Sequence, residues 1–472
     1  MGGKINVKSI SFGTVDAEAD RKLAEYFIKT NKVNDVLDLK SAHVIGRKGA
    51  GKSSMFTQLP RLIAERYGKK TRVSLMTPDQ YAWGALREYT EQGLLPEQAH
   101  TNAWKFTIAI DAASAILEID KSSFDDVELE AIKKIEKFLS SNFGAEAPTP
   151  TSTARRLLKG LSSFNIEAFG FGVGFEREKQ EQNLTPEIID QLLDVTSKAC
   201  KTHGVIVATD RLDDSWDGSD ISKSLLVGLL KATKEINDKY SEPDGTGLRV
   251  LTFLRSDIYQ VLHFDDKDKH RSVEDEIVWS PDELKEMVNA RLPNDVTVEA
   301  IFEKGDMRGS ISPFNYIVKR TFLRPREVIQ FLQECQRRCS REDTEISKDV
   351  IREAEERYST WKVEDLKQEY RRVFADFSEV LEALRQTQHR YDSIDDFIAT
   401  LESKIPEICS RHGARELLKK LFDASIIGVR LGNAGTARYR CEDPDLLLPA
   451  TGSVYIHQSL YRGLSIRETR AS

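Results

Sequence analysis

The chain has 472 residues, which is enough for two or three domains, and 31% charged with 40% hydrophobic residues is typical of a soluble protein. Its 69 basic and 76 acidic residues give a net charge of −7, so no overall basic excess points to nucleic acid. No run approaches the ~20 apolar residues of a membrane span, and the N-terminus has no apolar signal region, which predicts a cytoplasmic protein without a membrane partner.

The elements expected before residue 120 alternate between helix and strand. Residues 1–40 are expected to form an N-terminal segment, with helical spacing over 17–29. A short apolar strand at 44–45 then leads through a glycine-containing loop into a helix over 55–67, a second strand over 71–76 and a helix over 101–119. This order begins an α/β domain that we expect to cover 41–280.

The glycine-containing loop has the complete spacing of a phosphate-binding loop. Gly46 is followed after four residues by Gly51, Lys52 and Ser53. Glycines let backbone N–H groups turn toward phosphate oxygens, the following helix adds its positive end, and the lysine and hydroxyl are suited to β/γ-phosphates and Mg²⁺. We therefore expect ATP and Mg²⁺ as ligands, with a nucleotide-binding set of Gly46, Arg47, Lys48, Gly49, Ala50, Gly51, Lys52, Ser53 and Ser54.

Residues 120–183 are expected to be an insertion in this domain. A helix is predicted over 127–139. Over 164–175 phenylalanine and valine alternate with glycine, and this period of two predicts a strand. A small packed strand is favoured over a membrane-inserting hairpin, because a single short segment carries the pattern.

An aspartate ends the next strand. After a helix over 184–200, an apolar run over 204–209 leads to Asp210, which can hold the water shell of Mg²⁺ beside the phosphate loop. Many ATPases place a glutamate directly after this aspartate, but here the residue is Arg211. Asp213 or Asp214 must then polarise the attacking water, with Asp214 slightly preferred, or hydrolysis is slow.

Three later segments carry candidate arginines. Arg255 follows a buried strand over 247–254 that could lie between the two loops, which would place it by the γ-phosphate. Arg326 opens a helix over 327–339 and could reach the phosphates across a domain boundary. Arg271, in a charged loop, could enter a neighbouring subunit's site, and Arg291 competes with it for this role.

From residue 280 the chain is predicted to be helical, first as a lid domain over 281–345 and then as a helical and winged-helix-like domain over 346–472. The second assignment follows from a helix over 416–422, a strand over 426–430, a turn over 432–435 and a strand over 437–441. Five cysteines show no disulfide or zinc spacing, and Cys335 and Cys339 are interpreted as packed thiols rather than a metal half-site.

The ordered set of Gly46–Ser53, Val205–Asp214, Arg255 and Arg324-Pro-Arg326 resembles the additional-strand P-loop ATPases of the AAA+ and STAND-like kind, in an origin-recognition-type arrangement. More narrowly, Phe12-Gly13, Gly46-Arg-Lys-Gly49 and Ile456-His-Gln-Ser-Leu-Tyr461 resemble a bacterial ATPase family often encoded among mobile-element and anti-phage defence genes. The resemblance implies a P-loop sheet between helices, a homo-oligomeric ATP-driven switch with an effector partner, and Arg255 and Arg326 as first and second sensors. Arg211 departs from the usual AAA+ pattern and agrees better with the signal-transducing group, which argues against fast, motor-like turnover.

Two other functions remain open. A winged helix could dock on DNA in an ATP-dependent protein of origin-recognition or transposition type, supported by Arg411, Arg415, Lys419, Lys420 and Arg430 but diluted by interleaved acids. Alternatively, the chain could be a scaffold that binds nucleotide without turning it over, which Arg211 would explain.

Overall fold

The computed structural model describes residues 6–78, 80–88, 95–144, 147–149, 151–154, 186–214, 216–293, 296–430 and 436–468. The chain divides into two compact units. We call Lys29–Arg47 with Lys52–Ile277 the sheet unit, and Met1–Ile28, Lys48–Gly51 and Val278–Ser472 the helical unit.

The sheet unit is built on five parallel strands. Their order is β2 (Thr71–Met76), β3 (Gly204–Thr209), β4 (Gly247–Arg255), β1 (His43–Gly46) and β5 (Glu274–Glu276). All six residues of β3 are buried, as expected for a parallel strand covered on both faces. Gly46 lies opposite Arg255 in the register, so the carboxyl ends of β1 and β4 meet at one edge.

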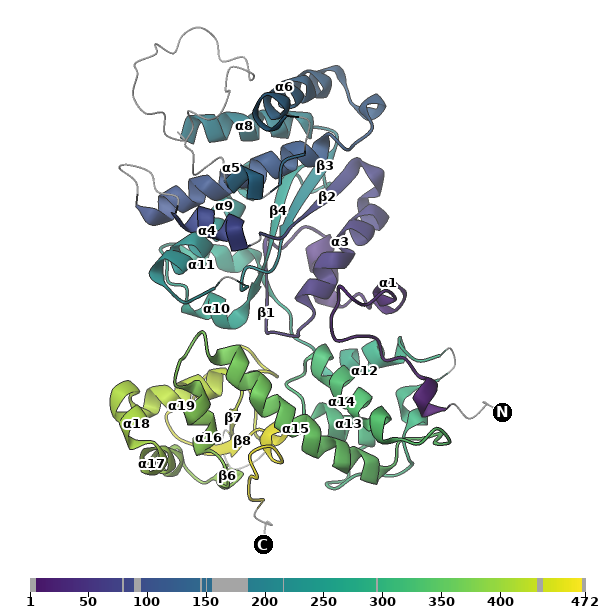
Figure 1. Cartoon of the computed structure of the whole chain (residues 1–472), viewed down its shortest axis with the longest axis vertical. Coiled ribbons are helices and arrows are strands. Elements are labelled where there is room, and N and C mark those ends of the chain that lie inside the picture. The colour runs from purple at the N-terminus through teal and green to yellow at the C-terminus, as the bar shows by residue number, and fades with distance from the viewer. Residues whose placement is uncertain are drawn as a thin grey trace. The chain divides into compact units, whose positions relative to one another are not determined.

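Helices cover both faces of this sheet. Figure 1 shows α3 (Lys52–Tyr67) on one side of the strands and α5 (Pro96–Ile116) and α9 (Asp220–Tyr240) on the other. Val205 and Val207 of β3 belong to the core that also contains Trp104 of α5 and Leu229 of α9. Further α-helices among the described residues of the unit are α2 (Asn31–Leu37), α4 (Gln80–Glu88), α6 (Asp126–Phe143), α8 (Pro186–Ala199), α10 (Ser256–Val261) and α11 (Lys267–His270).

The described part of the expected insertion packs into this same core. Helix α6 begins with a capping box between Asp125 and Glu128. Ile135 and Phe138 of α6 are buried in the core under α5 and α8. The strand expected over 164–175 lies outside the described residues.

The helical unit begins with the N-terminal residues. Helices α12 (Pro281–Asn289), α13 (Pro313–Val318) and α14 (Pro325–Arg338) share a hydrophobic core with the first half of α15 (Lys348–Tyr370). Helix α1 (Leu23–Tyr26) belongs to the same unit, and both its terminal residues are buried. Val7, Ile10 and Phe12 are part of that core. The expected single segment 1–40 therefore divides: residues 6–28 cluster with the later helices because their apolar side chains are buried there, and residues 29–40 with the sheet.

The second half of α15 enters another core. It packs with α16 (Phe377–Ala383), α17 (Ile394–Lys404), α18 (Pro406–His412) and α19 (Ala414–Asp423) and with a small antiparallel sheet. The order of that sheet is β6 (Arg390–Tyr391), β8 (Ser453–Ile456) and β7 (Ile427–Arg430).

One strand assignment in this region was wrong. The strand expected over 437–441 makes a single bridge, between Val429 and Arg438, and the main partner of β7 is β8. Residues 453–456 pair better because Val454 and Ile456 bury their side chains in the core on alternate positions. The expected turn at 432–435 lies outside the described residues.

Among the described residues, no helix has both the length and the apolar character needed to cross a membrane. All five cysteines are buried thiols, and Cys339 Sγ lies 3.4 Å from the carbonyl oxygen of Cys335.

Candidate functional site

The phosphate-type loop connects β1 to α3 as its spacing predicts. Gly49 and Gly51 have positive φ angles of +81° and +100°, which residues with a Cβ rarely adopt. Lys52 is the first residue of α3 and is 9% exposed. Its Nζ donates to the carbonyl oxygens of Gly46 at 2.8 Å and Arg47 at 3.1 Å. The lysine therefore spans the loop in contact with backbone oxygens.

Burial lowers the pKa of Lys52, while Asp210 and Asp213 oppose that shift. An ammonium group that is largely removed from water gains most from an anion placed beside it. The electrostatics of this lysine thus suit a negatively charged ligand at the loop.

Asp210 lies directly after β3 and meets the start of α3. Its backbone N–H donates to the carbonyl oxygen of Met76, and its Oδ2 accepts a 2.8 Å hydrogen bond from the hydroxyl of Ser53. Burial raises the pKa of this carboxyl above its usual range. A hydroxyl and a carboxylate are the hard oxygen donors that Mg²⁺ prefers, so this pair fits the ion expected from the sequence.

The chain turns sharply after Asp210. Arg211 has a φ of +62°, and the amide of Asp214 donates back to its carbonyl oxygen at 3.3 Å. This turn brings Asp213 Oδ2 within 3.2 Å of Nη1 of Arg255. Arg255 also donates from Nε and Nη2 to the two carboxylate oxygens of Asp257, at 3.0 and 2.6 Å.

Strand order explains this meeting of residues that are distant in the sequence. Strand β4 lies between β1 and β3, so Arg255 is carried between the loop after β1 and the turn after β3. Lys52, Ser53, Asp210, Asp213 and Arg255 are thus brought together at the carboxyl edge of the sheet, where parallel α/β proteins bind ligands.

Other candidate residues lie elsewhere. Asp214 is exposed on the turn. Arg271 follows α11 and precedes β5, so it lies at the amino end of a strand parallel to β1, opposite the edge that carries Lys52. Arg291 belongs to the helical unit, where its guanidinium lies 4.2 Å from the ring centre of Tyr26 and its Nη1 donates to Met287 O at 2.8 Å.

Arg326 meets the tip of the loop within the helical unit. It is the second residue of α14, and a Cβ added to Gly49 would lie 3.2 Å from the Arg326 Cβ. The indole Nε1 of Trp279 donates to the carbonyl oxygen of Ala50 at 2.8 Å. The loop tip is therefore contacted by one arginine and one tryptophan of that unit.

A buried ionic cluster anchors the start of α14 to α15. Arg324 Nη1 donates to Glu369 at 2.8 Å, and its Nε lies 3.4 Å from Glu327. Glu327 also binds the ammonium of Lys362 and accepts the amide of Phe322 at 2.6 Å. The helix that begins beside Arg326 is thus held by paired charges that are themselves almost fully buried.

Two residues of the site were not predicted. Asp257 stands two positions after Arg255 at the start of α10, where an acidic residue in a first helical turn is the signal that could have been noticed. Trp279 gave no local signal, because its contact with Ala50 joins residues 229 positions apart.

A five-stranded parallel sheet, a complete phosphate loop after β1 and Asp210 bonded to Ser53 define an α/β P-loop NTPase fold. Residues 282–367, from α12 into α15, match the family described as the FunZ-associated C-terminal helical domain. Across 98% of its length the chain is 23% identical to the putative transposon gamma-delta 80.3 kDa protein of Escherichia coli K12, and the alignment covers 68% of that protein. A comparison with the Walker-type ATPase PABY2304 of Pyrococcus abyssi covers 89% of this chain and 94% of that one, with 15% identity and a TM-score of 0.37.

Proposed function

We propose that this chain binds and hydrolyses ATP, with Mg²⁺, at Gly46–Ser54. The observation that carries the proposal is the hydrogen bond between Ser53 and Asp210 beside the buried ammonium of Lys52. The phosphate-loop motif and the aspartate that follows β3 thus lie side by side. A glycine-containing turn that matched the motif by chance would not explain this contact.

Each residue has a role that follows from its position. Lys52 exchanges its carbonyl partners for phosphate oxygens, and the amides of the loop add further donors. Ser53 and Asp210 hold the ion and its water. Mg²⁺ offsets the charge of the phosphates when it is bound. Asp213 accepts a proton from the attacking water, and Arg255 orients this carboxylate and faces the γ-phosphate.

Nucleotide binding would set the conformation of a switch. Arg326 and Trp279 contact the loop tip, so ligand-induced changes at Gly49 and Ala50 reach α14 and α12 directly. In the assembled form, Arg271 would act in a neighbouring subunit's site. The AAA+ or STAND-like character, the homo-oligomer, a cytoplasmic location and the winged-helix nature of the α16–β8 region belong to this proposal.

We place this switch in an anti-phage defence setting, acting with an effector protein. Two observations support this setting. The sequence resembles ATPases of defence and mobile-element loci, and nearly the whole chain is similar to a putative transposon protein.

Phosphate release by Lys52→Ala tests the proposal. Loss of this charge is expected to lower hydrolysis by about 10²–10³-fold, the effect typical of removing one electrostatic stabiliser. Lys69→Ala, which changes an exposed lysine outside the loop, is the matched lysine control and should hydrolyse as the wild type does. Equal rates in Lys52→Ala and wild type would reject Gly46–Ser54 as the active site. A wild type that binds ATP but releases no phosphate over many turnovers would instead support the scaffold.

DNA binding is the second candidate function. Helix α19 carries basic residues, but Lys419 pairs with Asp423 at 3.0 Å and Lys420 with Glu416 at 3.7 Å. Because these acids cancel much of the local charge, ATP-dependent assembly is favoured over recognition of duplex DNA.

A further inference from the structure

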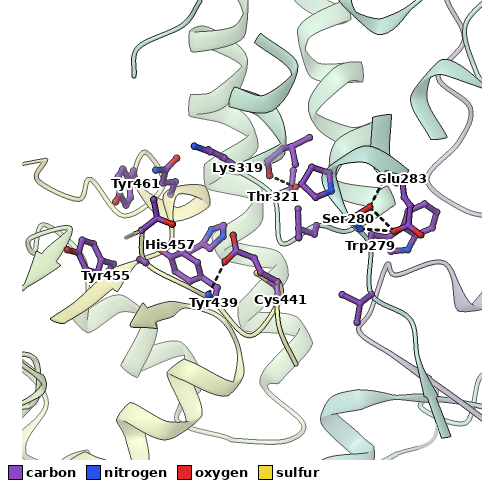
Figure 2. Close-up of a pocket in the computed structure, with 18 of the residues that line it drawn as sticks. Trp279, Ser280, Glu283, Lys319, Thr321, Tyr439, Cys441, Tyr455, His457 and Tyr461 are labelled. Atoms are coloured by element: carbon purple, nitrogen blue, oxygen red, sulfur yellow. Dashed lines mark hydrogen bonds between the residues drawn. The ribbon is translucent and has the colours of Figure 1, made fainter. Parts of the chain in front are cut away.

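A cavity of about 790 Å³ lies within the helical unit. Its walls come from the start of α12, the connection between α13 and α14, and the region of the small antiparallel sheet (Figure 2). The volume is in the range of small-molecule sites. None of the phosphate-loop residues lines it.

Three tyrosine rings and one tryptophan ring contribute to the walls. Tyr439, Tyr455 and Tyr461 stand on one side and Trp279 on the other (Figure 2). Tyr439 is held edge-on against the ring of His457, with 4.5 Å between ring centres. Rings fixed in this way by packing provide flat faces on which a planar ligand can stack, and stacking on tyrosine and tryptophan is how proteins hold nucleobases without reading their sequence.

The charged groups of the cavity do not suit a polyphosphate. Among the described residues that line the cavity, Lys319 is the only lysine or arginine, and it is accompanied by Glu283 and Glu442. Glu283 caps α12 by accepting the amide of Ser280 at 2.8 Å, and Glu442 accepts the amide of Tyr439 at 3.1 Å. A ligand with several phosphates would meet one cation and two carboxylates, so an uncharged planar ligand fits better.

Trp279 joins this cavity to the phosphate loop. It lines the cavity, and its Nε1–H donates to the carbonyl oxygen of Ala50. A ligand that stacks on the indole therefore restricts the same side chain that holds the loop tip.

We propose that the cavity is an effector site for a planar, uncharged ligand of the nucleoside class, and that Trp279 transmits its occupancy to the phosphate loop. The first half stands on the cavity alone. The second half rests on the proposed ATP site, because it requires ATP binding that can be altered.

Equilibrium dialysis with adenosine, guanosine, cytidine and uridine tests the first half. At least one should bind the full chain with a Kd below ~1 mM. Lys52→Ala should bind it equally well, whereas Tyr455→Ala, which removes a stacking face, and Thr436→Trp, which narrows the cavity from an exposed position, should each weaken binding by roughly tenfold or more.

Three results would overturn the first half. They are no binding by any of the four nucleosides, binding unchanged in both cavity variants, and complete displacement by saturating ATP, which would mean that the base of ATP itself occupies the cavity. Thr436→Trp keeps the test decisive if Tyr455→Ala does not fold.

The second half is tested by Trp279→Phe, which keeps an aromatic face but removes the donor to Ala50. In the wild type, a saturating nucleoside should change the Kd for ATP several-fold, and ATP should change nucleoside affinity by the same factor. In Trp279→Phe the nucleoside should still bind while this change disappears, and Trp361→Phe should behave as the wild type. If the nucleoside still changes the Kd for ATP in Trp279→Phe, Trp279 does not transmit occupancy of the cavity. If ATP does not bind the wild type, both this transmission and the proposed ATP site are rejected, whereas nucleoside binding to the cavity is not.

Discussion

Ser53 donates a 2.8 Å hydrogen bond to Asp210, and the two residues are 157 positions apart in the chain. The contact connects the first turn of α3 to the end of β3. It also holds a carboxyl group in a place from which water is largely excluded, and that burial raises the carboxyl pKa. Buried ionisable groups with shifted pKa values are concentrated at functional sites, so this carboxyl group is a functional candidate.

Asp210→Asn should make the protein without nucleotide more stable. The substitution removes a buried charge and keeps an oxygen that can accept from Ser53, so we expect a gain of about 0.5–2 kcal/mol in the free energy of unfolding. Thermal melting measures it, with the exposed Asp268→Asn as control, expected within about 0.5 kcal/mol of the wild type. Mg²⁺-dependent ATP binding should be lost in the first variant only. A destabilised Asp210→Asn would contradict this account of the carboxylate.

The pH dependence of Mg²⁺-supported ATP binding should reflect the raised pKa of Asp210. Protonation removes the negative charge, so binding should fall on acidification with a midpoint above the ~3.9 of an ordinary aspartate. The sign for stability is opposite: the ionised buried carboxyl costs free energy above its folded pKa, and that cost vanishes as pH falls through it. The stability advantage of Asp210→Asn should therefore shrink on acidification. A binding midpoint at or below ~3.9 would refute the assignment.

Asp213→Asn should reduce ATP hydrolysis more than Asp214→Asn. The carboxylate of Asp213 lies 3.2 Å from Arg255, whereas Asp214 is exposed. Loss of a general base typically costs about 10²–10⁴-fold in rate, and Asp214→Asn should stay within a few-fold of the wild type. Steady-state phosphate release compares the two variants, and the reverse order of effects would return the role to Asp214, which the sequence alone slightly favoured.

Glu327→Gln should strongly destabilise the helical unit. Glu327 lies between Arg324 and Lys362 in a nearly dry environment, and breaking a buried ion pair costs about 3–5 kcal/mol. Glu364→Gln, which affects an exposed pair on the same α15, should cost less than about 0.5 kcal/mol. Urea unfolding followed by tryptophan fluorescence compares both variants with the wild type. If Glu327→Gln lowers the free energy of unfolding as little as Glu364→Gln does, the buried cluster is not stabilising.

Binding to duplex DNA should be weak, with only a shallow dependence on salt. With the lysines of α19 paired to Glu416 and Asp423, we expect fewer than about two released counterions, or a slope of log K against log salt shallower than about −2. Fluorescence anisotropy across a salt series gives this slope. A steep slope that falls in Lys419→Ala would support the DNA-binding alternative.

Local patterns predicted most elements well. The second strand was expected over 71–76 and is observed as Thr71–Met76, and the strand expected over 247–254 is Gly247–Arg255. Runs of period 2 or 3.6 carry their own signal. Strand β5, with the sequence Glu-Asp-Glu, carries no such signal, because only its pairing with β1 makes it a strand.

Some residues of the candidate site could be picked out from local patterns as well. Gly46, Gly51, Lys52 and Ser53 lie within one short stretch of sequence, so their spacing can be recognised directly. Asp210 is recognised by the apolar run before it. Two contacts could not be predicted in this way. The bidentate contact of Asp257 with Arg255 depends on the directions of both side chains, and the contact of Trp279 with Ala50 joins residues far apart in the sequence.

The backbone changes from one unit to the other at four points, after residues 28, 47, 51 and 277. A fragment that starts at Val278 would consequently lack Val7, Ile10 and Phe12 and would expose apolar side chains of the core that these residues complete. Such a fragment is expected to aggregate. The helical unit should therefore be expressed together with the sheet unit, because the sheet unit lies between its segments in the sequence.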